Sequence, residues 1–268
     1  MKQIESYKLI SELFPLMNEG TDEALMKIKD VCKNHPCPVV RHEAVYCLSE
    51  VPSTESVEFL KSLLKEDKDP LVQHECLVSL GTIGKEEDVP FIEGFLKHEN
   101  PVVADSARVG LQRMTDEFDY EAEVKKNKNR FISELGDFSP EGQNRRIQII
   151  FQLMLLGARG DKDAVNAIYF SLANDPSEVV RHEAGYALGE VGSEYAIEFM
   201  SKDLQSEKSP VVIHEILFAL GTTGRESALP IIEKFLDSKE YIVRESAKIG
   251  RDRILKLERP YSGVRENL

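Results

Sequence analysis

Four His-Glu pairs are the residues of this chain whose types and spacing could do chemistry. They stand at His42-Glu43, His74-Glu75, His182-Glu183 and His214-Glu215. The first two histidines are 32 residues apart, the last two are also 32 apart, and the two sets are offset by 140 residues. Imidazole and carboxylate together form a ligand set for a divalent transition metal. Because the lattice holds four of the six histidines in the chain, it predicts a metal site.

The sequence around these pairs is duplicated. Residues 36–51 match residues 176–191 at 11 of 16 positions, and residues 70–84 match residues 210–224 at 9 of 15. Within each half there is a finer period of 31–32 residues, which is typical of a solenoid. The chain therefore consists of two copies of one helical-repeat segment.

Each repeat is predicted to contain two helices. An apolar stripe at helical spacing is formed by Val40, Ala44, Cys47, Leu48 and Val51. First-turn prolines are expected at Pro38, Pro70, Pro101 and Pro210, and helix-ending glycines at Gly84, Gly192 and Gly224. Because no useful length alternates with period two, we expect an all-α solenoid whose two duplicated halves face each other. The expected domains are an N-terminal half at 1–114, a linker at 115–144, a C-terminal half at 145–256 and a tail at 257–268.

Composition restricts the class of partner. The net charge of −13 argues against nucleic acid, whose phosphates need clustered Lys and Arg, and favours a cationic substrate or a basic partner. No stretch is apolar enough to cross a bilayer and no signal peptide is visible, so we expect no membrane association. The four cysteines all lie in the first half, which indicates reduced thiols in a cytoplasmic protein. We expect a monomer.

Neighbouring helices in such a stack lie about 8–10 Å apart, so equivalent positions on adjacent repeats can share one ion. His42 and His74 form one such set, and His182 and His214 form the other. Two imidazoles and a carboxylate with open positions suit non-haem Fe(II) and O₂ chemistry, although zinc also takes these ligands. If the two halves face each other, a dinuclear centre follows.

The pattern Pro-x-Val-Arg-x-x-Ala-x-x-x-Leu-Gly resembles HEAT repeats, in which helix pairs stack into a curved solenoid. The His-Glu pairs occupy two variable positions of that pattern. In the same slot, the last repeat of each half carries Asp105-Ser106 or Glu245-Ser246. Because the slot accepts these residues, folding does not require His-Glu there, and the pairs are predicted to serve function.

Over about residues 5–255, the fourfold motif on HEAT-like repeats resembles deoxyhypusine hydroxylase. This resemblance implies a di-iron monooxygenase that uses two Fe²⁺ ions, with O₂ as co-substrate, to hydroxylate the deoxyhypusine side chain of translation initiation factor 5A. The iron ligands that it implies are His42, His74, Glu75, His182, His214 and Glu215. It also implies that Glu43 and Glu183 are catalytic carboxylates that bind the amines of the substrate, together with Tyr46 and Tyr186. Paired carboxylates would replace the hydration of such a polyamine-like side chain.

The sequence departs from the family pattern beside the second motif of each half. Val78 and Phe218 stand where the family usually has glutamate, and Ser49 replaces a usual glycine after the first motif. These changes keep open a sister HEAT-repeat di-iron oxygenase that acts on a different, less cationic substrate. A non-catalytic HEAT-repeat scaffold and a protein similar to phycobilin lyases are further alternatives.

Three weaker signals are interpreted as ordinary surface or loop residues. His98-Glu99 lies outside the lattice, before Asn100-Pro101. Cys32, His35 and Cys37 form a compact trio, but the second half has no counterpart of it. The run 125–128 is expected to be a solvated face of the linker.

Overall fold

The computed structural model describes residues 6–115 and 124–256. Within these ranges all regular secondary structure is helical and there is no strand, which confirms the all-α prediction. The chain divides into two compact units, residues 1–117 and residues 118–268, here called the first and second unit. The arrangement of the two halves face to face stays a prediction.

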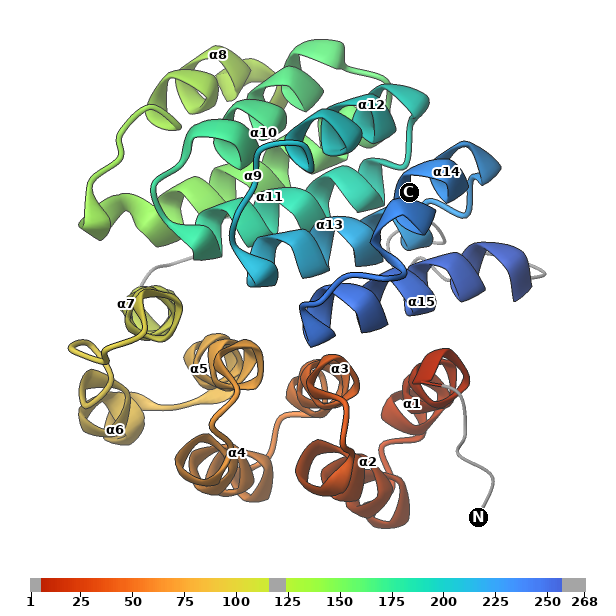
Figure 1. Cartoon of the computed structure of the whole chain (residues 1–268). Helices are drawn as coiled ribbons and strands as arrows, with labels where there is room; N and C mark the ends of the chain where they lie inside the picture. Colours follow the sequence, from red (N-terminus) through yellow and green to blue (C-terminus); the bar gives the residue numbers. More distant parts are fainter. Residues whose placement is uncertain (1–5, 116–123, 257–268) are drawn as a thin grey trace. The chain divides into compact units, whose positions relative to one another are not determined.

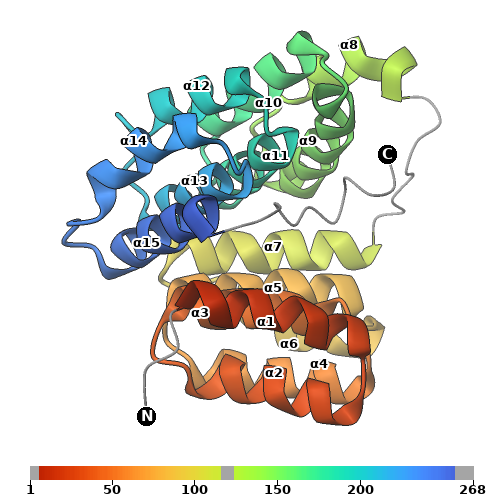
Figure 2. The same cartoon turned by 90° about the vertical axis from the view of Figure 1, so that its right-hand side faces the viewer.

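In the first unit the helices form two rows (Figures 1 and 2). The row that carries the His-Glu pairs contains α1, α3, α5 and α7, and the second row contains α2, α4 and α6. The bounds are α1 Ser6–Glu19, α2 Asp22–Asn34, α3 Pro38–Ser49, α4 Thr54–Glu66, α5 Pro70–Ile83, the 3₁₀ turn η1 Glu86–Asp88, α6 Val89–Glu93 and α7 Pro101–Thr115.

The second unit repeats this layout, with α9, α11, α13 and α15 in the row that bears the pairs (Figure 1). Its other helices are α8, α10, α12 and α14. The bounds are α8 Val124–Glu134, η2 Pro140–Gly142, α9 Gln143–Ala158, α10 Lys162–Asn174, α11 Glu178–Val191, α12 Glu194–Asp203, α13 Pro210–Thr222, η3 Glu226–Ala228, α14 Leu229–Ile232, η4 Glu233–Phe235 and α15 Tyr241–Lys256.

The helix starts follow from local chemistry. The four expected prolines are the first residues of α3, α5, α7 and α13, where a missing N–H leaves no intrahelical hydrogen bond unmade. Helices of the second row begin with polar caps: the side chain of Thr21 accepts from the backbone N–H of Ala24, and that of Ser193 accepts from Ala196. These caps and prolines set the register of each repeat.

The helices that bear the pairs are buried on nearly every side. In α5, eleven successive residues from Leu71 to Gly81 are buried, because the helix lies between α3 and α7 and also packs on α4. A helix that is apolar on most of its surface needs such surroundings. The buried His74 and Glu75, like Gln73 and Ser79, interrupt this apolar pattern, so they need polar partners inside the row.

The arginine before each first His-Glu pair anchors its helix. Arg41 makes a bidentate ion pair with Asp67, at 2.7 and 3.1 Å, and donates to the carbonyl of His35 at 2.9 Å. Arg181 makes the same set of contacts in the second unit, with Glu207 and the carbonyl of Asp175. Because Asp67 and Glu207 lie in the loops that precede α5 and α13, these ion pairs fix one ligand-bearing helix against the next.

Paired glycines set the spacing between α5 and α7. A Cβ on Gly110 would lie 2.6 Å from the carbonyl oxygen of Leu77, and one on Gly81 would lie 2.5 Å from Cα of Gly110. Gly221 and Gly250 make the equivalent approach between α13 and α15. The last helix of the row that bears the pairs, α7 or α15, can therefore bring a short side chain close to a histidine on the helix before it.

The segment predicted as a linker contains a packed helix. Helix α8 contacts α9 and α10, and Phe131 on it is buried. The predicted solvated run includes Lys128, whose ammonium pairs with Asp161 at 2.8 Å and with Asp163 at 3.2 Å. Lys128 therefore helps to hold α8 on the second unit.

Candidate metal half-sites

In the first unit, His42 on α3 meets His74 and Glu75 on α5. One ligand atom from each of the three side chains lies within 4.8 Å of the others. Nε2 of His42 is 3.4 Å from Oε2 of Glu75, and the two imidazole rings are nearly parallel with centroids 6.3 Å apart. All three side chains are buried. The 32-residue period thus places equivalent positions side by side, as the sequence predicted.

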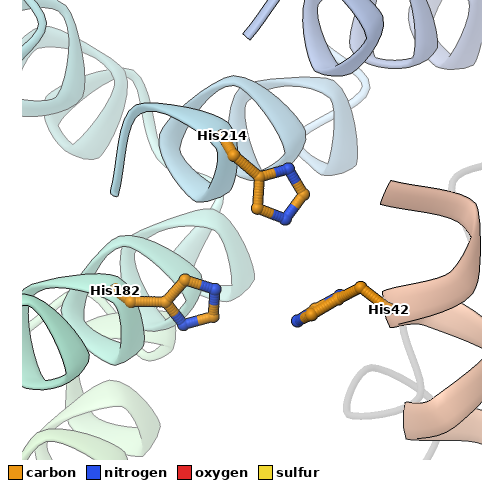
Figure 3. A group of neighbouring side chains, drawn as sticks. All are labelled: His42, His182 and His214. Atoms are coloured by element: carbon orange, nitrogen blue, oxygen red, sulfur yellow. The ribbon is translucent and has the colours of Figure 1, made fainter. Parts of the chain in front are cut away.

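The second unit holds the equivalent set, His182 on α11 with His214 and Glu215 on α13. Figure 3 shows the imidazoles of His182 and His214 extending from these two helices. Oε2 of Glu215 lies 3.4 Å from Nε2 of His182 and 3.9 Å from Nε2 of His214, and the ring centroids are 6.2 Å apart. Each unit therefore gathers two imidazoles and one carboxylate by itself.

These donors fit a non-haem Fe(II) ion. Two neutral imidazoles and one carboxylate form the facial set that leaves coordination positions open. The three ligand atoms of the first unit, all within 4.8 Å of one another, are close enough to surround one ion after small side-chain adjustments. The buried carboxylate supplies the negative charge that a buried cation requires.

The first glutamate of each half contacts the histidine beside it. Oε1 of Glu43 lies 3.1 Å from Nδ1 of His42, and Oε1 of Glu183 lies 3.8 Å from Nδ1 of His182. Burial alone would lower the pKa of His42, but its hydrogen bonds with Glu43 and Glu75 and the charges of both outweigh burial and raise the pKa to about 10. With no cation bound, a positive charge is therefore favoured at His42, and a metal ion would displace that proton to bind the neutral imidazole.

The second histidine of each half is bonded to a serine that sequence reasoning missed. Nδ1 of His74 lies 2.8 Å from Oγ of Ser106 on α7, and Nδ1 of His214 lies 2.7 Å from Oγ of Ser246 on α15. The sequence comparison used Asp105-Ser106 only to show that folding does not require His-Glu at this position, and it did not predict this contact. The signal that could have found it is the recurrence of serine at the same place in both halves.

The tyrosines one turn beyond the first pairs have different surroundings. Burial, followed by the charges of Glu50 and Glu43, raises the pKa of Tyr46, so its phenol stays protonated. The ring of Tyr186 packs edge-on against Phe151, with centroids 6.1 Å apart. The proximity of Tyr46 to these carboxylates agrees with its predicted place on the face that bears the ligands.

The departures from the family pattern change the surroundings of the second unit most. The ring of Phe218 lies 6.1 Å from that of His214, and the guanidinium of Arg253 lies over Phe218 at 4.2 Å from its centroid. Arg253 also donates to Oγ1 of Thr222 at 2.6 Å. In the first unit the equivalent Val78 is buried and aliphatic. The two half-sites thus share donors but differ in the side chains beside them.

Ser49 is accommodated by its own helix. Its hydroxyl donates to the carbonyl of Tyr46 at 2.8 Å. At the equivalent Gly189, a Cβ would lie 2.6 Å from Cβ of Ala219. The second unit therefore needs glycine where the first accepts serine.

Of the weaker sequence signals, the two histidines lie in loops, whereas the interpretation of Cys32 as a surface or loop residue is wrong, because it is wholly buried in α2. His98 follows α6 in a loop, where its Nδ1 accepts from the backbone N–H of Asn100 at 3.2 Å. Nδ1 of His35 likewise accepts from the backbone N–H of Cys37 at 3.2 Å. Both contacts agree with the interpretation of these histidines as loop residues.

The chain is similar to known proteins in sequence and in fold. A family profile described as HEAT repeats matches residues 25–112. Deoxyhypusine hydroxylase of Schizosaccharomyces pombe is 42% identical over 50 residues, which cover 19% of this chain and only 15% of that relative. The structure of human deoxyhypusine hydroxylase in complex with glycerol superposes with a TM-score of 0.78 and 24% identity, over 91% of this chain and 88% of the human chain.

These matches confirm the predicted resemblance to deoxyhypusine hydroxylase. At 24% identity, the likeness to the human structure shows the shared fold, a HEAT-like solenoid. The phycocyanin lyase complex of Nostoc is also similar, but its TM-score of 0.32 is too low to bear on the fold. No helix within residues 6–115 and 124–256 is long and apolar enough to span a membrane.

Proposed function

We propose that this protein is a non-haem di-iron, O₂-dependent hydroxylase that acts as deoxyhypusine hydroxylases do. The observation that carries the proposal is the presence, in each unit, of two buried imidazoles and one carboxylate at matching positions. The resemblance to the fission yeast and human enzymes supports the same conclusion. The proposed substrate is the deoxyhypusine side chain of translation initiation factor 5A, and the proposed form is a cytoplasmic monomer.

Iron and O₂ would supply the oxidising power: one oxygen atom enters a C–H bond, and the other leaves as water with two electrons from an external reductant and two protons. The ligands of the first unit would be His42, His74 and Glu75. Those of the second unit would be His182, His214 and Glu215. Because these side chains are buried, the fold limits the access of bulk water to them.

Glu43 and Glu183 are proposed to orient the amines of the substrate. A carboxylate has two oxygens, so Glu43 can accept from His42 with one and from a substrate ammonium with the other. Tyr46 stays protonated beside it and can donate a hydrogen bond. The resulting role is to hold a cationic chain in place without binding the metal.

A second candidate is a hydroxylase with a less cationic substrate. The contact of Arg253 with Phe218, beside His214, favours it, because this guanidinium would repel an ammonium approaching that side of the half-site. An apolar or anionic group would meet no such repulsion. The reaction class is the same in both candidates.

Metal analysis tests the proposal directly. We expect about two iron ions per chain after anaerobic loading. His74→Ala should lower this to about one, since only the first unit loses a donor. His98→Ala is the matched control, because this histidine belongs to a His-Glu pair outside the lattice and should leave the iron content unchanged. Stoichiometric zinc instead of iron, or no bound metal, would refute the di-iron assignment.

Mass spectrometry separates the candidate substrates. Incubation of the iron-loaded protein with a deoxyhypusine-bearing factor, O₂ and a reductant should add one oxygen atom to the factor. Iron binding without this addition would favour the second candidate. A chain that binds no metal would instead support the alternative of a non-catalytic scaffold.

A further inference from the structure

We propose that Ser106 and Ser246 are positioning residues that hold His74 and His214 in the tautomer with hydrogen on Nδ1, so that Nε2 of each ring is directed to the metal. This inference rests on the metal sites of the proposed function. It assigns a role to two side chains that the implied ligand set leaves out.

The hydroxyl of each serine already uses its hydrogen. Oγ of Ser106 donates to the carbonyl of Val102 at 2.6 Å, and Oγ of Ser246 donates to the carbonyl of Ile242 at 2.8 Å. A serine hydroxyl has one hydrogen and two lone pairs, so what each Oγ presents to the imidazole is a lone pair. Nδ1 must then be the donor in the 2.8 Å contact of His74 and in the 2.7 Å contact of His214.

The tautomer decides which nitrogen can bind a metal. A neutral imidazole with hydrogen on Nδ1 has its lone pair on Nε2 alone. In the second unit, Nε2 of His214 is the nitrogen that faces Oε2 of Glu215, at 3.9 Å. The serine thus directs the metal-binding lone pair toward the carboxylate with which it would share an ion.

The two histidines of each half are oriented by different groups. His42 has the carboxylate of Glu43 beside Nδ1, whereas His74 has the hydroxyl of Ser106. Histidines that bind metals commonly donate their second N–H to a carboxylate, a carbonyl or another oxygen, which fixes the ring. Serine is suited to His74, because a further buried carboxylate would add a charge that lacks a partner.

The backbone is arranged so that these serines reach the rings. Gly81 and Gly110 let α5 and α7 approach until a Cβ would clash with backbone, and Gly221 and Gly250 do so for α13 and α15. His74 and Ser106 are both fully buried. Because the arrangement occurs in both units, 140 residues apart, it is a property of the duplicated half-site.

Nuclear magnetic resonance of the metal-free protein tests the tautomer without any reference to activity. Long-range ¹H–¹⁵N correlation on ¹⁵N-histidine protein should show a protonated Nδ1 and an unprotonated Nε2 for His74 and His214. Ser106→Ala should turn His74 into a mixture of tautomers and leave His214 unchanged. The opposite tautomer in the unaltered protein would overturn the inference.

Metal titration supplies the second readout. Ser106→Ala should weaken binding of Fe²⁺ to the first unit about 10–100-fold, as loss of a group that orients a ligand does. Ser106→Thr keeps the hydroxyl and should restore the affinity. Ser171→Ala is the control, since Ser171 is a fully buried serine on α10, outside the row of helices that bears the histidines. Unchanged affinity in Ser106→Ala would contradict the proposed role.

The two readouts separate this inference from the proposed function. If the unaltered protein binds no metal but shows the predicted tautomer, the function fails and the role of the serine in orienting the ring stands. If Ser106→Ala does not fold, Ser246→Ala gives the same test in the second unit, and the spectrum of the unaltered protein still decides the tautomer.

Discussion

Replacement of Gly110 by alanine is the sharpest test of how the fold holds its first half-site. The added Cβ would lie 2.6 Å from the carbonyl oxygen of Leu77, where ordinary contact begins at 3.4 Å. The obstructing atom belongs to backbone, so no rotamer change can relieve the clash. Helix α7 must therefore move away from α5 by about 0.8 Å.

The magnitude follows from three effects. Overpacking of this kind costs about 1–3 kcal/mol. Displacement of α7 would stretch the 2.8 Å contact between Ser106 and His74 to the limit of a hydrogen bond, at a cost of about 1 kcal/mol. Alanine gains about 1 kcal/mol over glycine inside a helix. We expect Gly110→Ala to lower the free energy of unfolding by about 1–3 kcal/mol.

Urea unfolding and iron titration measure the two consequences. The midpoint should fall, and the affinity of the first unit for iron should fall with it. Gly185→Ala is the matched control: its Cβ would lie 3.5 Å from the nearest atoms, so it should gain up to about 1 kcal/mol. Equal stability of Gly110→Ala and the unaltered protein would refute the reasoning, since α7 would then have space to spare.

Two further predictions concern buried charges. Arg146, which is buried, pairs with Asp175 at 2.6 Å. Arg146→Met leaves that carboxylate buried without its partner and should lower the free energy of unfolding, measured in urea, by about 3–5 kcal/mol. An unchanged urea midpoint would show that the pair contributes nothing to stability. Burial, followed by the charge of Glu207, raises the pKa of Asp203 from 3.8 to about 6. Between these two values the folded protein binds more protons than the unfolded chain, so its stability falls as the pH rises through them. Asp203→Asn should flatten this dependence and add about 1–2 kcal/mol at pH 7; equal slopes of stability against pH would contradict the assignment.

The sequence was sufficient to predict which ligand-bearing helices are neighbours. A 32-residue period in a helical repeat puts His42 beside His74, and first-turn prolines such as Pro70 mark where α5 begins. Both results depend on local pattern and on a stacking rule that holds throughout such repeats. The nearness of Glu75 to His42 follows from the same register.

What the sequence could not show depends on contacts made at atomic distance. Ser106 lies 32 residues after His74, in step with the histidine period, but its role depends on how closely Gly110 lets α7 approach. The packing of α8 was missed because the mixed charges around Lys128 hide the ion pair with Asp161. The contact between Phe218 and Arg253 joins two helices and has no local signature.

Each half-site draws its donors from one unit, and this has a thermodynamic consequence. An ion that binds only the folded unit stabilises that unit by mass action, by about 4 kcal/mol when free metal is a thousand times the dissociation constant. The two units would then gain or lose this stabilisation separately, according to the occupancy of each. Metal supply would thus set how long each half resists local unfolding and proteolysis, besides setting how fast the protein turns over its substrate.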